Sequence, residues 1–99
     1  MAVYDELERC VGFEWDEGNE RKNWAKHRVT DPECEEVFFN APLFAGIGLK
    51  HSKRENRYFA LGQTDTGRPI FVAFTIRGTR IRVLSARDMT RREMRQYGI

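Results

Sequence analysis

Two strand-like segments joined by a very short loop place the strongest constraint on this sequence. Residues 68–77 and 80–87 are rich in isoleucine, valine, phenylalanine and threonine, which favour β-strands. Gly78-Thr79 separates them as a two-residue loop, with glycine in the position where a type II′ turn needs it. Such a turn fixes the register of the two strands. The expected pairs are Arg77–Arg80, Thr75–Arg82, Ala73–Leu84 and Phe71–Ala86.

This register gives the hairpin two unlike faces. One face is almost entirely apolar and is predicted to belong to the core. Its residues are Ile70, Val72, Phe74 and Ile76 with Ile81, Val83, Ser85 and Arg87. The other face sets Arg77 directly across from Arg80, which is unfavourable for two like charges. A pair that costs stability suggests the hypothesis that this face binds an anionic partner.

The segment before the hairpin extends the basic face. Residues 64–68 (Thr-Asp-Thr-Gly-Arg) have the pattern of a type I turn closed by a left-handed glycine. In that register Arg57 pairs with Thr75 and joins the arginine side, whereas a slip of one residue would send it to the other face. The expected cluster consists of Arg57, Arg77, Arg80 and Arg82. Arginines gathered in this way are usual where phosphates are bound.

Length and charge narrow the class of protein. The 99 residues are enough for one domain with a single core. Residues 1–49 carry a net charge of −6 and residues 50–99 a net charge of +8. Either the two halves neutralise each other within the fold, or the second half presents a basic binding surface. Two cysteines without paired Cys/His spacing predict neither a disulfide framework nor a metal site or cofactor. Without a membrane-length apolar run or a signal-peptide core, we expect a cytoplasmic protein.

Helices are predicted ahead of the sheet. Residues 1–12 fit either a short helix or a loose arm, and residues 13–15 read as a short strand. Asp16 is expected to cap a helix over residues 17–27. A second helix, capped by Thr30 or Asp31 with proline in its first turn, is expected to end at residues 40–42. The residues expected in the core here are Trp24, Cys34, Val37, Phe38, Phe39 and Phe44.

Strands and a last helix complete the expected fold. Strands are predicted at about residues 43–49, 57–62, 69–77 and 80–87. Thr90-Arg91-Arg92-Glu93 is a capping-box signature and predicts a helix that extends to about Tyr97. Two helices followed by an antiparallel meander and a closing helix make an α+β domain of two layers.

A series of short motifs runs from about Phe13 to Tyr97. They are Phe13-Glu14-Trp15-Asp16, Asn23 with Lys26-His27, the helix from Glu33 to Phe38, Arg57-Tyr58, Gly62, Thr66-Gly67-Arg68, Arg77-Gly78 with Arg80-Ile81-Arg82, Ser85-Ala86-Arg87, Arg91-Arg92-Glu93 and Tyr97. In order and spacing they resemble the BrnT family, the ribonuclease toxins of type II toxin–antitoxin pairs. The resemblance implies a RelE-like fold, with two N-terminal helices packed on an antiparallel sheet and a C-terminal helix.

The same resemblance implies a function and partners. It implies a toxin that cuts mRNA and arrests translation, together with a BrnA-like ribbon-helix-helix antitoxin that inhibits the toxin. Operator DNA would be bound only through that antitoxin, and no membrane is involved. Asn19 stands where the family usually has lysine, and Arg28 where it usually has glycine. A non-catalytic module that binds nucleic acid or antitoxin through the same basic face is therefore the alternative.

RNA cleavage by attack of a 2′-hydroxyl needs proton transfer and charge stabilisation. His27 suits the proton transfer because histidine exchanges protons near neutral pH, although a histidine at a helix end also commonly contacts the terminal carbonyls. Arginine keeps its proton, so Arg57, Arg77 and Arg82 are candidates for stabilising charge on the phosphoryl oxygens. The candidates for RNA binding are Lys26, Arg80 and Arg87. The alternative for the arginine cluster is the docking of an acidic partner segment. The alternative for Arg87 is a buried ion pair with an acidic residue of the first half of the chain.

Overall fold

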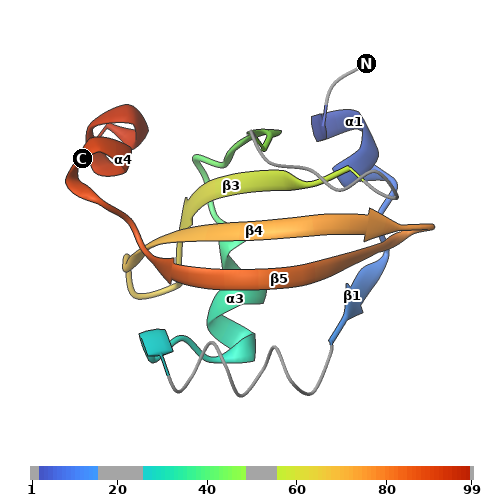
Figure 1. Cartoon of the computed structure of the whole chain (residues 1–99), viewed down its shortest axis with the longest axis horizontal. Coiled ribbons are helices and arrows are strands. Elements are labelled where there is room, and N and C mark those ends of the chain that lie inside the picture. Colours follow the sequence, from blue (N-terminus) through green and yellow to red (C-terminus); the bar gives the residue numbers. More distant parts are fainter. Residues whose placement is uncertain (1–2, 16–25, 49–55, 99) are drawn as a thin grey trace.

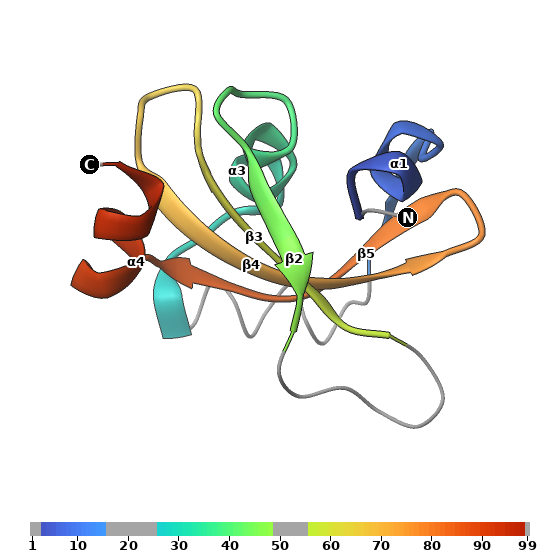
Figure 2. The same ribbon diagram turned by 90° about the horizontal axis from the view of Figure 1, so that it is seen from above.

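One five-stranded sheet with helices around it makes up the computed structural model, which describes residues 3–15, 26–48 and 56–98. The elements are α1 (Val3–Glu8), β1 (Gly12–Glu14), α3 (Asp31–Val37), β2 (Phe44–Ile47), β3 (Tyr58–Gln63), β4 (Pro69–Arg77), β5 (Arg80–Asp88) and α4 (Arg91–Tyr97). The strand order is β1-β5-β4-β3-β2 (Figure 1). Helices α1 and α3 lie on one side of the sheet, and α4 follows the end of β5 (Figure 2).

The predicted α+β class is confirmed, but the sheet is mixed and not antiparallel. Strands β2 to β5 form the expected antiparallel meander, while β1 pairs with β5 in parallel. The short segment at residues 13–15 was expected to be a strand, and it needed the edge of β5 to find its partner. Because the parallel partner of β1 lies far along the chain, no turn sequence between the two strands could predict their pairing.

The β4–β5 hairpin forms as predicted near its turn. Gly78 has φ +60°, as the first position of a type II′ turn requires, and Arg77 pairs with Arg80. The register of the turn before β4 is also confirmed, since Gly67 has φ +86° and its N–H donates to the carbonyl of Thr64. These two glycines therefore set the alignment of the three central strands.

A β-bulge changes the pairing beyond the middle of the hairpin. Phe74 pairs with Val83 but Ala73 pairs with Ser85, which leaves Leu84 as the extra residue of β5. The predicted pairs Ala73–Leu84 and Phe71–Ala86 are therefore wrong, as is the placing of Ser85 and Arg87 on the core face. The observed pairs beyond the bulge are Val72–Ala86, Phe71–Arg87 and Ile70–Asp88.

The core lies between the sheet and the α1/α3 layer. Its fully buried members include Val29, Cys34, Val37, Ile70, Val72, Phe74, Val83 and Ala86. Burial of each large apolar side chain contributes roughly 1.5–3 kcal/mol. Gly62 of β3 lets α3 approach closely, because a Cβ at this position would lie 2.6 Å from the Val37 Cγ1 atom. The residues of this core face therefore position α3 on the sheet.

Capping residues explain where the helices begin and end. Thr30 accepts a hydrogen bond from the N–H of Glu33 and so caps α3, and Thr90 with Glu93 forms the predicted capping box of α4. Gly98, in the left-handed conformation, ends α4. Of the two alternatives for residues 1–12, a short helix or a loose arm, the structure has a helix at Val3–Glu8. Among the described ranges, no helix is long and apolar enough to cross a membrane.

Two predicted core residues lie at the surface. Phe39 is 78% exposed because α3 ends at Val37, and Phe44 is 42% exposed because it lies on the outer side of the edge strand β2. The predicted helix at residues 17–27 falls mostly outside the described residues, as do Trp24 and Asn19. Its last two residues, Lys26 and His27, are described and helical.

Candidate functional site

The sheet face away from α1 and α3, here called the outer face, gathers four arginines at its hairpin end. These residues, the arginine cluster, are Arg57, Arg77, Arg80 and Arg82. Arg77 pairs with Arg80, and Thr75 pairs with Arg82. Arg57 lies one residue before the Tyr58–Phe74 pair, which places it across from Thr75. The predicted register of the cluster is confirmed.

The arginine cluster surrounds a buried threonine. Thr75 is 1% exposed, and its Oγ1 atom donates a hydrogen bond to the backbone carbonyl of Asn56 at 2.8 Å. This bond ties the approach to β3 onto β4 and so helps to hold Arg57 on the side of Thr75 opposite to Arg82. Arg57, Arg77 and Arg80 are exposed, whereas Arg82 is half-buried and its Nε atom is shielded from solvent. The cluster thus has one rigid member and three that reach into solvent.

A carboxylate that sequence reasoning missed adjoins these arginines. Glu14 of β1 pairs in parallel register with Arg82, and its Oε1 atom lies 3.8 Å from Nη1 of Arg77. Both side chains of this ion pair are largely exposed, so it contributes little to stability. Residues 13–15 were expected to be a strand, but only the parallel pairing with β5 reveals where Glu14 points.

His27 lies at the other end of the sheet. Its backbone carbonyl accepts a hydrogen bond from Arg68 Nη2 at 3.2 Å, and its charge interacts with Asp88. Arg68 comes just before β4 and Arg77 ends it, so nine strand residues at roughly 3.3 Å each separate the two arginines by about 30 Å. The structure therefore does not bring His27, or the exposed Lys26 beside it, to the arginine cluster.

Arg68 organises that second region, which sequence reasoning had not singled out. Its Nε donates to Asp88 at 2.7 Å, and its Nη1 contacts Glu33 at 3.2 Å and the carbonyl of Arg28 at 2.9 Å. The hydrogen bond from Arg68 holds the pKa of Asp88 below its ordinary value. Arg28 has φ +55°, a left-handed conformation that glycine adopts most readily, and Arg68 donates a hydrogen bond to its carbonyl. This region is built as a structural clamp.

Arg87 forms an ion pair on the outer face. Its guanidinium donates to both carboxylate oxygens of Glu93, at 2.8 and 3.0 Å, and lies 4.1 Å from the ring centre of Phe71. Hydrogen bonds from Arg87 lower the pKa of Glu93, against the opposing effect of burial. Arg87 does form an ion pair, but the expected partner in the acidic first half is wrong, because the carboxylate belongs to Glu93 of α4 and the pair is only partly buried.

A groove lies between α4 and the outer face. It has a volume of about 430 Å³, and its lining includes Ile47, Phe59, Leu61, Phe71, Glu93 and Gln96. We call it the α4 groove. The rings of Phe59 and Phe71 are nearly parallel, with an interplanar angle of 6° and centroids 6.3 Å apart. The pairing of β3 with β4 places both rings on the outer face, and α4 completes the hollow around them, which no local sequence signal indicated.

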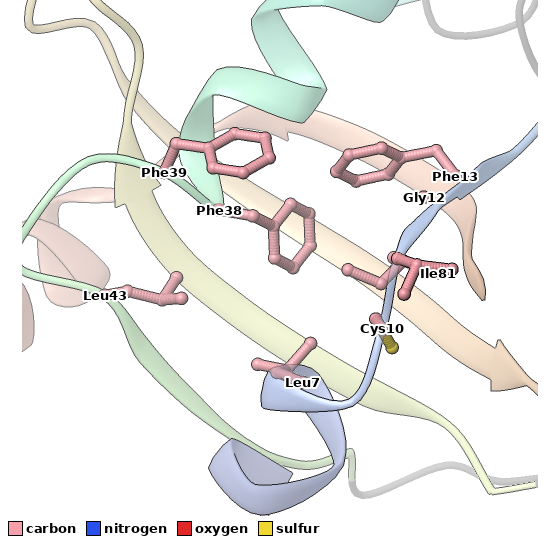
Figure 3. A pocket seen from close by; sticks show the side chains of 9 residues that line it. Leu7, Cys10, Gly12, Phe13, Phe38, Phe39, Leu43 and Ile81 are labelled. Carbon is pink, nitrogen blue, oxygen red and sulfur yellow. The ribbon is translucent and has the colours of Figure 1, made fainter. Parts of the chain in front are cut away.

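A second hollow lies on the helical side of the sheet. It has a volume of about 210 Å³, and side chains from α1, β1 and the end of α3 converge on it (Figure 3). Phe39 packs edge-on against Phe13 above it. Cys10 also lines it, but burial and the nearby Glu6 raise the pKa of this thiol, so it is a poor nucleophile. This hollow has apolar walls and offers no charged group to bind phosphate.

Comparisons with known proteins agree with this architecture. A sequence model of the family described as the ribonuclease toxin BrnT of type II toxin–antitoxin systems matches residues 15–93. The 1.1 Å crystal structure of the Brucella abortus ribonuclease toxin BrnT is similar, with a TM-score of 0.61 and 24% sequence identity. The alignment covers 82% of this chain and 99% of that chain, and at this identity it supports the fold. No curated protein sequence matches. Because the family model matches most of the chain, the chain belongs to the BrnT family of ribonuclease toxins of type II toxin–antitoxin systems.

Proposed function

We propose that this chain is an endoribonuclease that cleaves mRNA without a metal ion and thereby arrests translation. The observation that carries the proposal is the gathering of four arginines around Thr75 on one open sheet face. Phosphate contacts of this kind hold RNA without reading its sequence, so broad cutting of single strands is expected. The fold is proposed to be the RelE-like one that the family resemblance implied.

The cleavage step assigns separate tasks to separate residues. The 2′-oxygen of the RNA attacks phosphorus, the bond to the 5′-oxygen breaks, and a 2′,3′-cyclic phosphate and a 5′-hydroxyl result. Arg57, Arg77 and Arg82 stabilise the charge that develops on the phosphoryl oxygens, while Arg80 binds a neighbouring phosphate. A base must take the 2′-proton, and an acid must return one to the 5′-oxygen.

Glu14 is placed to act as the base. Its Oε1 atom lies 3.8 Å from Nη1 of Arg77, whereas His27 lies beside Arg68 at the far end of β4. Geometry comes before proton affinity in choosing a catalytic base. The sequence suggested His27 as a catalytic residue. If it is one, the RNA must be cut at the end of the sheet where His27 lies, and Lys26 would bind a phosphate there.

The test is cleavage of single-stranded RNA by the purified protein in EDTA. Arg82→Ala is expected to reduce the rate about 10²- to 10³-fold, as loss of one charge-stabilising donor typically does. Arg9→Ala, an exposed arginine just after α1 on the helical side, is the matched control and should leave the rate unchanged. Intact RNA in this assay would refute the proposal.

A parallel pair of variants decides the base. Glu14→Gln should reduce cleavage about 10²- to 10⁴-fold, because a glutamine cannot accept the proton. His27→Gln should leave most of the rate. The reverse result would assign the base to His27 and move the cleavage site to the Arg68 region.

The partners follow from the family. Membership of a type II toxin–antitoxin family implies an antitoxin. We propose that this antitoxin is a BrnA-like ribbon-helix-helix protein and that the toxin reaches operator DNA through it. A stable complex of the two proteins that binds operator DNA, when the toxin alone does not, is the expected result. Direct operator binding by the toxin alone would contradict it.

A second candidate function is a non-catalytic module that regulates the operon. The observation that favours it is the Glu14–Arg77 pair, which partly neutralises the arginine cluster. Arg28, whose backbone is left-handed, stands where the resemblance leads us to expect glycine, and this departure also favours the non-catalytic module. Such a module would bind RNA in a salt-dependent manner without forming product.

A further inference from the structure

The α4 groove and the arginine cluster occupy the same face of the sheet. Arg57 comes just before β3 and Phe59 lies two residues later on the same face, so their Cα atoms are about 7 Å apart. Phe71, on the neighbouring strand β4, pairs with Arg87, and Thr75 farther along β4 pairs with Arg82. One continuous surface therefore leads from guanidinium groups to two aromatic rings. The phosphate and the base of one nucleotide can bridge a separation of this size.

The lining of the groove indicates what kind of group enters it. Most of its exposed area is apolar, and the parallel rings of Phe59 and Phe71 line it, with the Arg87 guanidinium over the Phe71 ring at 4.1 Å from its centre. Its volume of about 430 Å³ falls in the range of small-ligand sites. The acidic residue of the groove, Glu93, has its charge matched by the two hydrogen bonds from Arg87. A flat, neutral heteroaromatic group suits this site better than an anion does.

We propose that the α4 groove binds a nucleobase of a single-stranded RNA whose phosphates lie on the arginine cluster. This inference rests on the proposed function, because it requires RNA to be the ligand of the outer face. Stacking on aromatic rings holds a base without identifying it. The carboxylate oxygens of Glu93 already accept bonds from Arg87 and from the backbone N–H of Thr90. The groove should therefore bind a strand with bases more tightly than an abasic strand, and its affinity should differ little between the four bases.

Binding of an oligonucleotide that cannot be cut separates this inference from catalysis. The probes are a short 2′-O-methyl RNA, whose blocked 2′-oxygens prevent cleavage, and an abasic strand of the same length and charge. The wild-type chain should bind the strand with bases roughly 5- to 150-fold more tightly, the range given by stacking of one base on an aromatic side chain. Both strands should lose affinity in the same proportion as salt is raised, since their phosphate contacts are equal.

Two variants and one control test the groove itself. Phe59→Leu keeps an apolar side chain but removes a ring, and Gln96→Trp fills the groove from its exposed rim without touching the core. Both should bring the affinity ratio close to one. Phe44→Leu is the matched control, because this exposed phenylalanine of the neighbouring strand contacts Tyr97 and not the groove. It should preserve the wild-type ratio.

The outcomes distinguish the two proposals. If cleavage fails but the strand with bases is preferred and the preference depends on Phe59, the endoribonuclease proposal falls and the base site stands. If RNA is cleaved but the two strands bind alike, or both groove variants keep the preference, the base site is refuted. If the groove variants lose antitoxin binding while keeping the base preference, the groove is a protein-docking site and the inference is overturned.

Discussion

The ion pair between Arg87 and Glu93 should be the main attachment of α4 to the sheet. The guanidinium makes two hydrogen bonds, at 2.8 and 3.0 Å, and the side chains are 34% and 18% exposed. Glu93→Gln is the clean perturbation, because glutamine also serves at this position of a capping box and leaves the helix start intact. Arg87→Met, which keeps the apolar contact with Phe71, is its counterpart.

The magnitude follows from the geometry. A hydrogen bond to a charged group contributes about 1.5–3 kcal/mol when well buried, and partial exposure reduces this, so the two bonds should together couple Arg87 to Glu93 by about 2 kcal/mol. Urea unfolding of the wild type, both single variants and the double variant measures that coupling energy directly. A coupling below about 0.5 kcal/mol would show that apolar contacts, and not the ion pair, are the main attachment of α4, and would refute the reasoning.

The same pair predicts a pH dependence with a definite sign. Hydrogen bonds from Arg87 lower the pKa of Glu93 in the folded state. The stabilisation is therefore complete above the unfolded pKa of about 4.3 and is lost as the pH falls through the folded value. The stability difference between the wild type and Glu93→Gln should be full at neutral pH and should vanish in strong acid. A difference that persists unchanged in acid would contradict this assignment.

Three further predictions concern the stability of the fold. Gly62→Ala should destabilise the protein by about 1–3 kcal/mol, because its new Cβ would lie 2.6 Å from Val37 Cγ1, whereas Gly12→Ala, with no atom within 4 Å, should change the free energy of unfolding by less than about 0.5 kcal/mol. Arg68→Met should cost about 2–3 kcal/mol at neutral pH and less in acid, as measured by urea unfolding, since its carboxylate partners then become protonated. Cys34 is fully buried with a pKa raised to about 12, so a thiol reagent should label it only when the chain unfolds.

Local chemistry was sufficient to predict the meander and the basic face. The turns at Gly67 and Gly78 need positive φ, and each fixes a register that holds for the residues closest to it. The capping threonines Thr30 and Thr90 likewise mark helix starts that the structure confirms. These signals act over a few residues, which is why they can be read from one sequence.

The features that were missed depend on contacts between distant segments. Glu14 joins the arginine cluster through parallel pairing with a strand almost 70 residues later. His27 was expected near the same arginines because a histidine beside a basic surface suits RNA cleavage, but the length of β4 keeps it away from them. Neither position follows from residue type or from local spacing.

The bulge at Leu84 has the largest consequence for the site. An unbroken register would have turned Arg87 toward the core and left Ala86 on the outer face. The extra residue reverses both: Ala86 is fully buried, and Arg87 reaches Phe71 and Glu93. The arginines near the turn are unaffected because they precede the bulge. The inserted residue thus brings Arg87 to the outer face, where it binds Glu93 of α4 beside the aromatic rings that share this face with the arginine cluster. A phosphate-binding end and an aromatic groove on one face are what binding of a single-stranded polyanion with bases requires.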